Sequence, residues 1–506
     1  MAATVSRNSR PADSVLEKAS KDASTDATTE NIYRPLNEAP ITLAGDSAAA
    51  ERRLIWKLDL IIFPIFFILY MMSFLDRINI SNAKIQGMAE ELNLTGHRFN
   101  VALFIYFVSY ILFQVPSNML IKKARPSLYI SGLVLSWGLI NMCMGFVQSY
   151  GTLVLLRFLL GVFEAGVLPA MLYVSSMYYK RHEYQLRVSC MFSSTAVAGA
   201  FGGLIAYGIS KVDSVKSTWR YIFIIEGAAT AFLGVVAAFV IIDWPEQTRW
   251  LNKEEKNVLR RRLIADVDEV CRMDRLDRPA VRRILTDYKI WLSGLIYLAI
   301  GVPGYSGAFF LPTILKEFHW STSEAQLRTV PVYVFAAGCM IIGAWASDKL
   351  KHRSGFIVGG TCLSTIGFVM LLSQDGKSRE YKFAAVFPLL GGAFMTVPMA
   401  LGWLQNNLAG TWKKSIGTAM QVMGGNLAGI IGSNVFLTSE SPKFHTGYGA
   451  CLAFMWLGAL SAVLLAVLLS RENRLRTEGR RDYLLKLPEN EKDNLGDAHP
   501  TFRFTL

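Results

Sequence analysis

Residues 58–83 read LDLIIFPIFFILYMMSFLDRINISNA, an apolar run with an acid and a base side by side near its end, Asp76 and Arg77. A helix needs about 20 mostly apolar residues to cross the hydrocarbon core of a bilayer. Charges inside such a segment are costly, and they are retained mainly where they bind or move something. This stretch therefore predicts a membrane-spanning helix that carries part of a functional site.

Eleven further apolar runs follow in the chain of 506 residues, which is 52% hydrophobic and only 18% charged. Such a composition is too apolar for a soluble protein of this length. The twelve runs cover residues 58–83, 100–121, 127–147, 151–178, 186–210, 219–242, 289–315, 329–347, 355–373, 382–405, 415–437 and 447–470. We predict an all-α membrane protein with twelve transmembrane helices in two six-helix bundles.

A long polar stretch separates the sixth run from the seventh and divides the chain into halves. We predict a disordered cytoplasmic tail (1–50), an N-terminal bundle (51–242), a cytoplasmic linker (243–288), a C-terminal bundle (289–470) and a cytoplasmic C-terminal tail (471–506). Val258, Leu259, Leu263 and Val267 recur at helical spacing within the linker, which predicts a short amphipathic helix. This helix is interpreted as a connector at the membrane surface, with a regulatory bar as the alternative.

The net charge of +13 reflects membrane topology, because the basic residues gather in alternate loops. They cluster at 52–57, 122–125, 180–187, 260–262, 349–353, 413–414 and 471–476. By the positive-inside rule, both termini lie in the cytoplasm, and we expect a multi-pass protein of the plasma membrane that binds no nucleic acid. The six cysteines are scattered and no Walker-type phosphate loop is present, so the sequence predicts no metal site, cofactor, ATP-driven transport or enzymatic activity.

A second charged couple lies in the fourth run, RFLLGVFEAG at residues 157–166. Arg157 and Glu164 are nearly two helical turns apart, on one face and about 10 Å from each other along the axis. A guanidinium suits a carboxylate ligand, and a buried glutamate can carry a proton. We predict a substrate anchor at Arg157 and a proton carrier at Glu164; the alternative is a buried ion pair that only holds helices together.

The charges of the two couples balance, since Asp76, Arg77, Arg157 and Glu164 sum to zero when all are ionised. A bound monoanion leaves this site at −1, and burying that unpaired charge is costly. One proton on Glu164 or Asp76 restores neutrality, so that anion and proton favour each other's binding. The four residues predict proton symport of an anion, with the number of protons open.

The last four runs contain no internal charges but carry amides and aromatic rings. Neutral amides can hydrogen-bond a substrate without coupling it to protons. The first half is therefore predicted to handle charge and the second half to read substrate shape, although aromatic residues in spans more often serve packing. The predicted substrate-binding residues are Arg77, Arg157, Asn79, Tyr305, Trp403, Asn407 and Asn426.

Three segments resemble a known family. FLDRIN at 74–79, RFLLGVFEAG at 157–166 and WRYIFIIEG at 219–227 resemble helix signatures of the anion:cation symporters within the major facilitator superfamily, nearest to the fungal allantoate permease branch. The resemblance implies a small carboxylate cargo such as a vitamin or ureide, protonation at Asp76 and Glu164, and anion binding by the arginines. It also implies a gating loop with Asp348, Lys349 and Arg353, while Glu226 is either a third proton site or an interhelical partner.

The function predicted from the sequence is secondary transport of a small organic carboxylate with protons, by alternating access, in a protein that acts as a monomer. Two alternatives stay open. One is efflux of a fungal metabolite. The other is a nutrient sensor that keeps the transporter fold without transporting.

Overall fold

The structure of the protein is a computed structural model that describes residues 44–121, 124–211, 217–266, 278–350, 352–437, 440–488 and 495–506. Most of the predicted N-terminal tail (1–50) lies outside these ranges. Within them the chain forms helices and turns, without strands.

The N-terminal half consists of a long first helix and six shorter ones. Its elements are α3 (Ala44–Ala83), continued by η3 (Lys84–Met88) and α4 (Ala89–Glu91), then α5 (Arg98–Ile121), α6 (Pro126–Met144), α7 (Tyr150–Glu164), α8 (Val167–Ser176), α9 (Arg181–Ser210) and α10 (Trp219–Val240). Helices α7 and α8 follow one another as a single span, so this half provides six spans.

The C-terminal half has six long helices, preceded by two short ones in the linker. They are α11 (Lys253–Asp266), α12 (Arg278–Leu285), α13 (Tyr288–Glu317), α14 (Thr322–Leu350), α15 (Arg353–Leu372), α16 (Arg379–Asn406), α17 (Thr411–Gly432) and α18 (His445–Thr477). Among the described residues, eleven helical segments are long and apolar enough to cross a membrane. The glycine-rich α17 falls below that hydropathy but packs along α13, and it completes the predicted twelve.

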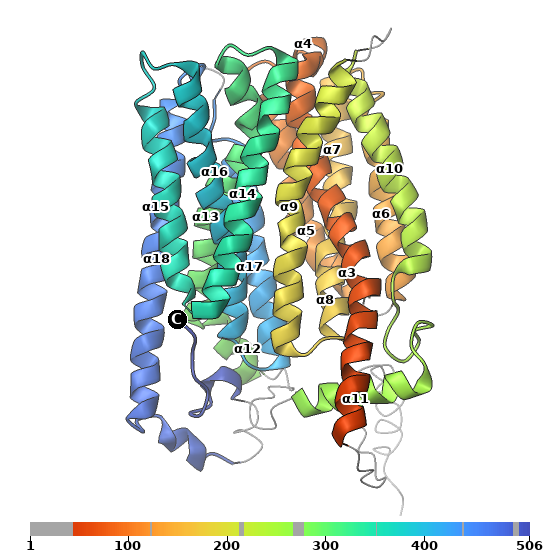
Figure 1. The fold of residues 1–506 in the computed structure, drawn as a ribbon, viewed down its shortest axis with the longest axis vertical. Coiled ribbons are helices and arrows are strands. Elements are labelled where there is room, and N and C mark those ends of the chain that lie inside the picture. Colours follow the sequence, from red (N-terminus) through yellow and green to blue (C-terminus); the bar gives the residue numbers. More distant parts are fainter. Residues whose placement is uncertain are drawn as a thin grey trace, which may run out of the picture.

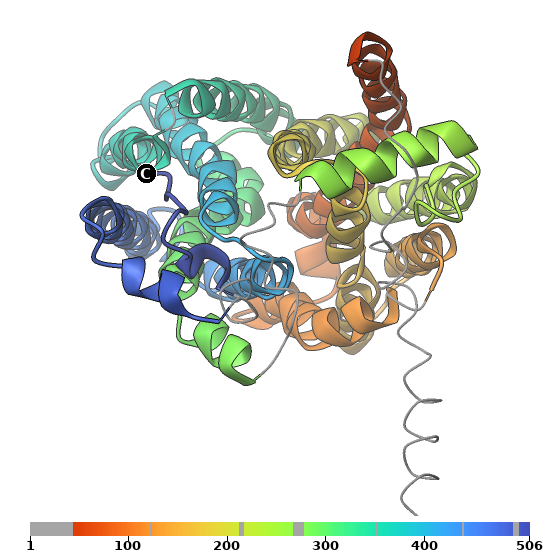
Figure 2. The ribbon, with the colours of Figure 1, turned by 90° about the horizontal axis from the view of Figure 1, so that it is seen from below.

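The spans run side by side along the long axis of the molecule (Figure 1) and form two lobes when viewed from below (Figure 2). Helix α11 lies across the N-terminal lobe at one end of the molecule, which we call the α11 end. Helix α4 lies at the opposite end, which we call the α4 end. Of the amphipathic helix predicted in the linker, Val258, Leu259 and Leu263 lie in α11, and Val267 lies outside the described residues.

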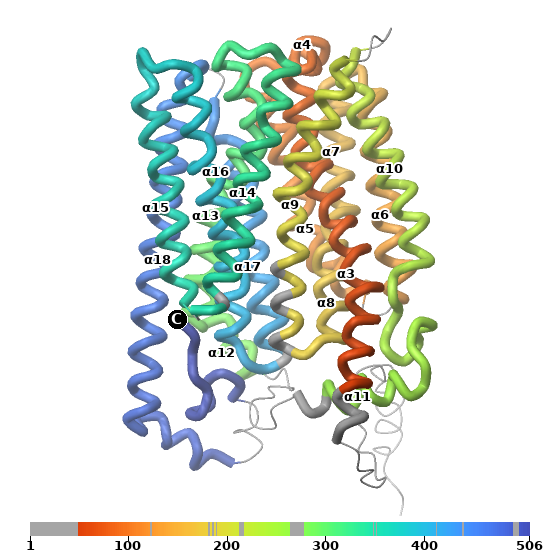
Figure 3. The backbone as a smooth tube through the Cα atoms, viewed as in Figure 1, coloured from red at the N-terminus to blue at the C-terminus, as the bar shows by residue number. Residues whose placement is uncertain are grey.

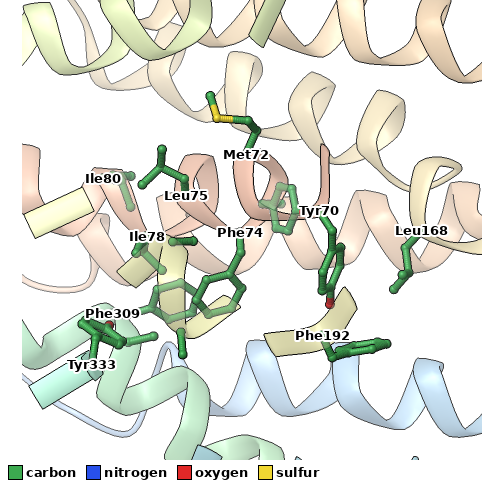
Figure 4. Close-up of a cluster of buried hydrophobic side chains, with 14 of the residues drawn as sticks. Tyr70, Met72, Phe74, Leu75, Ile78, Ile80, Leu168, Phe192, Phe309 and Tyr333 are labelled. Carbon is green, nitrogen blue, oxygen red and sulfur yellow. The ribbon is translucent and has the colours of Figure 1, made fainter. Parts of the chain in front are cut away.

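The lobes meet along α9 and α14, along α5 and α17, and along α3 and α13. Figure 4 shows apolar side chains from both sides: Tyr70 faces Phe192 within the N-terminal lobe, and Phe309 lies near Tyr333 within the C-terminal lobe. The rings of Tyr70 and Phe192 are 4.9 Å apart. Glycines permit the closest approaches: a methyl group on Gly199 would collide with the Tyr333 ring.

Hydrogen bonds join the two lobes at the α4 end. The Asn100 amide donates to the Ser433 carbonyl oxygen at 2.7 Å, and the Gln86 amide donates to Gln326 at 3.1 Å. The helix loses regular geometry here in η3, where Gly87 adopts φ +104°, a conformation that other residues rarely tolerate. The freed carbonyl of Ile85 accepts from Lys316 of the opposite lobe.

The last residues of the chain pack against the α11 end of the C-terminal lobe (Figure 3). We call residues 495–506 the C-terminal strap. Its backbone bonds to Arg353, Asn407 and Asn473, which belong to or follow three different helices. The sequence predicted a tail from residue 471 onward; in the structure α18 continues to Thr477 before the chain turns back.

Candidate functional site

A buried ion pair between Arg77 of α3 and Glu164 of α7 forms the centre of the site. The Arg77 Nη2 and Nε atoms lie 2.5 Å and 2.7 Å from Glu164 Oε1. The Ser73 hydroxyl donates to the same oxygen and accepts from Arg77 Nη2 at 3.1 Å. The two charged side chains are 3% and 1% exposed, so the pair is removed from water.

Glycines bring α7 close enough to make this pair. A methyl group on Gly161 would collide with the Tyr106 carbonyl oxygen of α5, so α7 and α5 pack almost backbone to backbone. Helix α7 ends at Glu164, and Gly166 lies against Ser117 at the break before α8. The carboxylate therefore lies at a helix end, directly beside Arg77.

Aromatic rings surround the Arg77 guanidinium on the side that faces the C-terminal lobe. Its carbon lies 5.5 Å from the ring centre of Tyr106 and 5.2 Å from that of Tyr110. Tyr305 of α13 lies beside the same guanidinium, and its ring is 5.2 Å from that of Phe107. Arg77 is thus placed at the boundary between the lobes, where a transporter binds its substrate.

Asp76 points into the N-terminal lobe instead, because successive helical residues are rotated by about 100°. Its carboxylate accepts hydrogen bonds from Trp137 Nε1 and Asn141 Nδ2, both at 2.7 Å, and from the Thr230 hydroxyl at 3.4 Å. Arg157 Nη1 donates to the backbone carbonyl of Asp76 at 3.4 Å. The four predicted charges therefore form one cluster with two sides, of which only the Arg77 side reaches the other lobe.

Several polar atoms of this cluster have no hydrogen-bond partner among the described residues. They are Glu164 Oε2, Arg157 Nε and Nη2, both Glu226 oxygens and both amide atoms of Asn79. A buried polar atom without a partner costs roughly 1–3 kcal/mol. The cluster therefore holds several buried polar atoms whose cost is not offset by a partner among the described residues.

The remaining predicted substrate residues are spread over the molecule. Asn426 of α17 donates to Gln114 of α5 at 3.3 Å and so bridges the lobes. Trp403 and Asn407 do not join the charged cluster: the Trp403 indole and the Asn407 amide donate to the Thr505 carbonyl oxygen of the C-terminal strap at 2.9 Å and 3.0 Å. These two residues lie at the end of α16. The sequence alone could not show that the C-terminal strap packs there.

The predicted gating residues lie at the α11 end. Lys349 is exposed, and its ammonium lies 5.1 Å from the Trp345 ring centre. Arg353 is buried, and its backbone N–H donates to the carbonyl oxygen of Leu506 at 2.7 Å. The side chain of Asp348 is outside those that the structure describes.

Sequence reasoning missed five residues that build the cluster: Ser73, Tyr106, Tyr110, Trp137 and Asn141. A signal was present for three of them, since Ser73 precedes Arg77 by one turn and Trp137 precedes Asn141 by one turn. No three His, Cys, Asp or Glu residues gather into a metal-binding group within the described ranges. The cluster is chemically suited to anions and protons.

Comparison with known proteins fits this geometry. The family model described as Major Facilitator Superfamily matches residues 66–433 of this chain. The chain belongs to the major facilitator superfamily. It is therefore a multi-pass membrane transporter and not an enzyme, and the predicted all-α fold of twelve helices is confirmed.

Curated relatives of this transporter are fungal. It is 33% identical to the MFS transporter prlL of a fungal species over 88% of this chain and 92% of the relative. It is 29% identical to a high-affinity nicotinic acid transporter of Saccharomyces cerevisiae over 97% and 92%. The D-xylose-proton symporter shares the fold, with a TM-score of 0.61 at 16% identity over 81% of this chain and 97% of that one.

Proposed function

We propose that this transporter moves a small organic monocarboxylate together with one proton, with Arg77 binding the carboxylate and Glu164 carrying the proton. The observation behind the proposal is that one guanidinium, at the boundary of the lobes, is occupied by a carboxylate of the protein itself. A substrate carboxylate and the Glu164 carboxylate compete for that guanidinium. Protonation of Glu164 weakens its hold on Arg77 and frees the guanidinium for the substrate.

This exchange keeps the charge of the site constant. Before loading, Arg77 is balanced by the ionised Glu164; after loading, it is balanced by the substrate, while Glu164 is neutral. A substrate without a proton leaves an extra buried negative charge, and a proton without a substrate leaves Arg77 unpaired. Both half-loaded states are costly in a site removed from water, so the two ligands bind together.

Arg157 and Asp76 lie on the side of the cluster that faces away from the C-terminal lobe, where they support the Arg77–Glu164 pair. Arg157 bonds to the α3 backbone at Asp76, directly before Arg77, and so positions the turn that carries the guanidinium. The three donors around the Asp76 carboxylate hold that side chain in place within the N-terminal lobe. The anchor role predicted for Arg157 passes to Arg77, because Arg77 faces the opposite lobe. With one proton carried on Glu164 per monoanion, transport is electroneutral.

The α11 end is assigned to the cytoplasm, because the basic loops predicted by the positive-inside rule lie there. The hydrogen bonds at the α4 end then close the site toward the outside, as expected for one state of alternating access. The tyrosines around Arg77 suit a flat ring attached to the carboxylate. The fungal relative named for nicotinic acid supports a substrate of this class.

The test is uptake of nicotinate into proteoliposomes with an inward proton gradient, followed by a panel of aromatic and aliphatic monocarboxylates. Wild-type protein is expected to accumulate at least one of them, Glu164→Gln to exchange it without accumulating it, and the exposed Glu324→Gln to behave as wild type. Accumulation by Glu164→Gln at the wild-type level contradicts the proposal. Accumulation driven by the opposite gradient indicates efflux, and binding without transport indicates a sensor.

A further inference from the structure

A second cation lies on the face of α3 that carries Arg77. Lys84 follows Arg77 by seven residues, which places it on the same side of the helix and about 10 Å nearer the α4 end. It is half-buried between the two lobes. Its ammonium lies 4.2 Å from the ring centre of Phe99 on α5 and 5.8 Å from that of Phe310 on α13.

Lys84 makes no ion pair or hydrogen bond with any described residue, although Glu317 and Glu90 attract it from a distance. Losing water around an ammonium is costly, and contact with aromatic faces returns only part of that cost. A cation without an ion-pair partner binds a free anion more readily than a cation that is already held in a tight ion pair. Arg77, by contrast, must first be released by Glu164.

The rings around Lys84 come from opposite lobes. Phe99 belongs to the N-terminal half and Phe310 to the C-terminal half, and their ring centres are 6.2 Å apart. Alternating access requires the lobes to separate at the α4 end, so both rings cannot stay in contact with the ammonium when the site opens there. In that state Lys84 lies at the mouth of the boundary between the lobes.

The boundary between the two cations is aromatic. Phe107 and Phe309 have ring centres 6.0 Å apart, and Phe309 stacks on Tyr305 beside Arg77. A flat ring can move along such a surface while its carboxylate passes from one cation to the next. Aromatic rings therefore occupy the lobe boundary between Lys84 and Arg77.

We propose that Lys84, flanked by Phe99 and Phe310, is an entry subsite that captures the carboxylate of an aromatic monocarboxylate before it reaches Arg77. The proposal rests on the proposed function. Removing the charge weakens capture from the α4 side alone, because the substrate arriving from the α11 side meets Arg77 without passing Lys84. A role confined to packing would alter transport from both sides equally.

The test measures the KM for nicotinate, or for the best substrate of the panel, in intact cells and in inside-out vesicles. Lys84→Gln is expected to raise the KM from the outer side about tenfold, the value of one lost charge-assisted hydrogen bond, and to leave the other side unchanged. Lys84→Arg keeps the charge and is expected to stay near wild type. Arg328→Gln is the matched control, because Arg328 stacks on Trp320 at the same end within one lobe.

An unchanged outer KM for Lys84→Gln, with active wild type, overturns the subsite and leaves the proposed function standing. An equal rise from both sides also overturns it, in favour of a packing role. If the wild-type protein transports no carboxylate at all, the proposed function fails and the subsite fails with it.

Discussion

Two buried ionic clusters in this transporter contain the same kinds of group but differ in how fully they are paired. The first is the Asp76, Arg77, Arg157 and Glu164 cluster of the N-terminal lobe. The second, which we call the strap cluster, consists of Asp287, Lys289, Lys413 and Asp497. Lys413 lies 2.5 Å from Asp287 and 2.8 Å from Asp497, and Lys289 pairs with the same two carboxylates.

In the strap cluster, each of the two carboxylates forms an ion pair with both ammonium groups. Burial by itself raises the pKa of Asp497, but the charges of Lys289 and Lys413 outweigh it and hold that pKa below its ordinary value. In the N-terminal cluster, the Arg157 guanidinium and the Glu164 carboxylate keep unpartnered atoms. Mutually paired buried charges fasten elements together, whereas the N-terminal cluster, which combines unpartnered atoms with the Arg77 guanidinium at the lobe boundary, fits the partner exchange proposed above.

The largest effect is expected from Arg77→Ala, which removes the guanidinium at the centre of the N-terminal cluster. Removing the guanidinium takes away the substrate's partner and leaves Glu164 buried without a cation, so we expect carboxylate uptake to fall at least about hundredfold. Uptake per folded molecule, with folding checked by thermal unfolding, measures this. Arg77→Lys keeps the charge but loses the bidentate fork, and it is expected to retain part of the activity. Near-normal uptake by the alanine variant contradicts the anchor role.

The corresponding change in the strap cluster is Asp497→Asn. It leaves two buried ammonium groups to share Asp287, and we expect a loss of about 3 kcal/mol in unfolding free energy with an unchanged KM. Because the folded-state pKa of Asp497 is lowered, its stabilisation is present at neutral pH and disappears as the pH falls through that lowered value. Thermal unfolding and uptake kinetics test this. A raised KM at unchanged stability indicates that the strap cluster serves the substrate.

A smaller effect is expected from a substitution next to Asp76. Trp137→Phe removes one of three donors to Asp76 and is expected to cost about 1.5–3 kcal/mol of stability, with transport retained. If Asp76 is instead the transported proton's carrier, this variant changes the pH dependence of uptake. Uptake measured across pH values, beside wild type, separates the two outcomes.

The smallest effect is expected at the strap. Trp403→Phe loses the hydrogen bond to Thr505 and is expected to cost about 1 kcal/mol, with the substrate KM unchanged within about twofold. Thermal unfolding and uptake kinetics measure both quantities. A strongly raised KM indicates that Trp403 contributes to substrate binding, as predicted from the sequence.

The sequence predicted what depends on segment length and on the cost of charge in a bilayer. That reasoning found the twelve spans and drew attention to Asp76, Arg77, Arg157 and Glu164. It could not show that the neighbours Asp76 and Arg77 bind different partners, because partner identity depends on which helices pack against α3. Nor could it show that the last residues return to Trp403 and Asn407, since a polar tail has no periodicity that reveals its docking site.

The most direct test of the account is the pH dependence of carboxylate affinity in wild type and in Glu164→Gln. Because the substrate binds when Glu164 is protonated, wild-type affinity is expected to weaken by up to about tenfold for each unit of rising pH above the range where Glu164 loses its proton. The glutamine variant cannot ionise at this position, so its affinity is expected to stay nearly constant over the same range. Equal pH dependence in the two proteins contradicts the claim that substrate and Glu164 share Arg77.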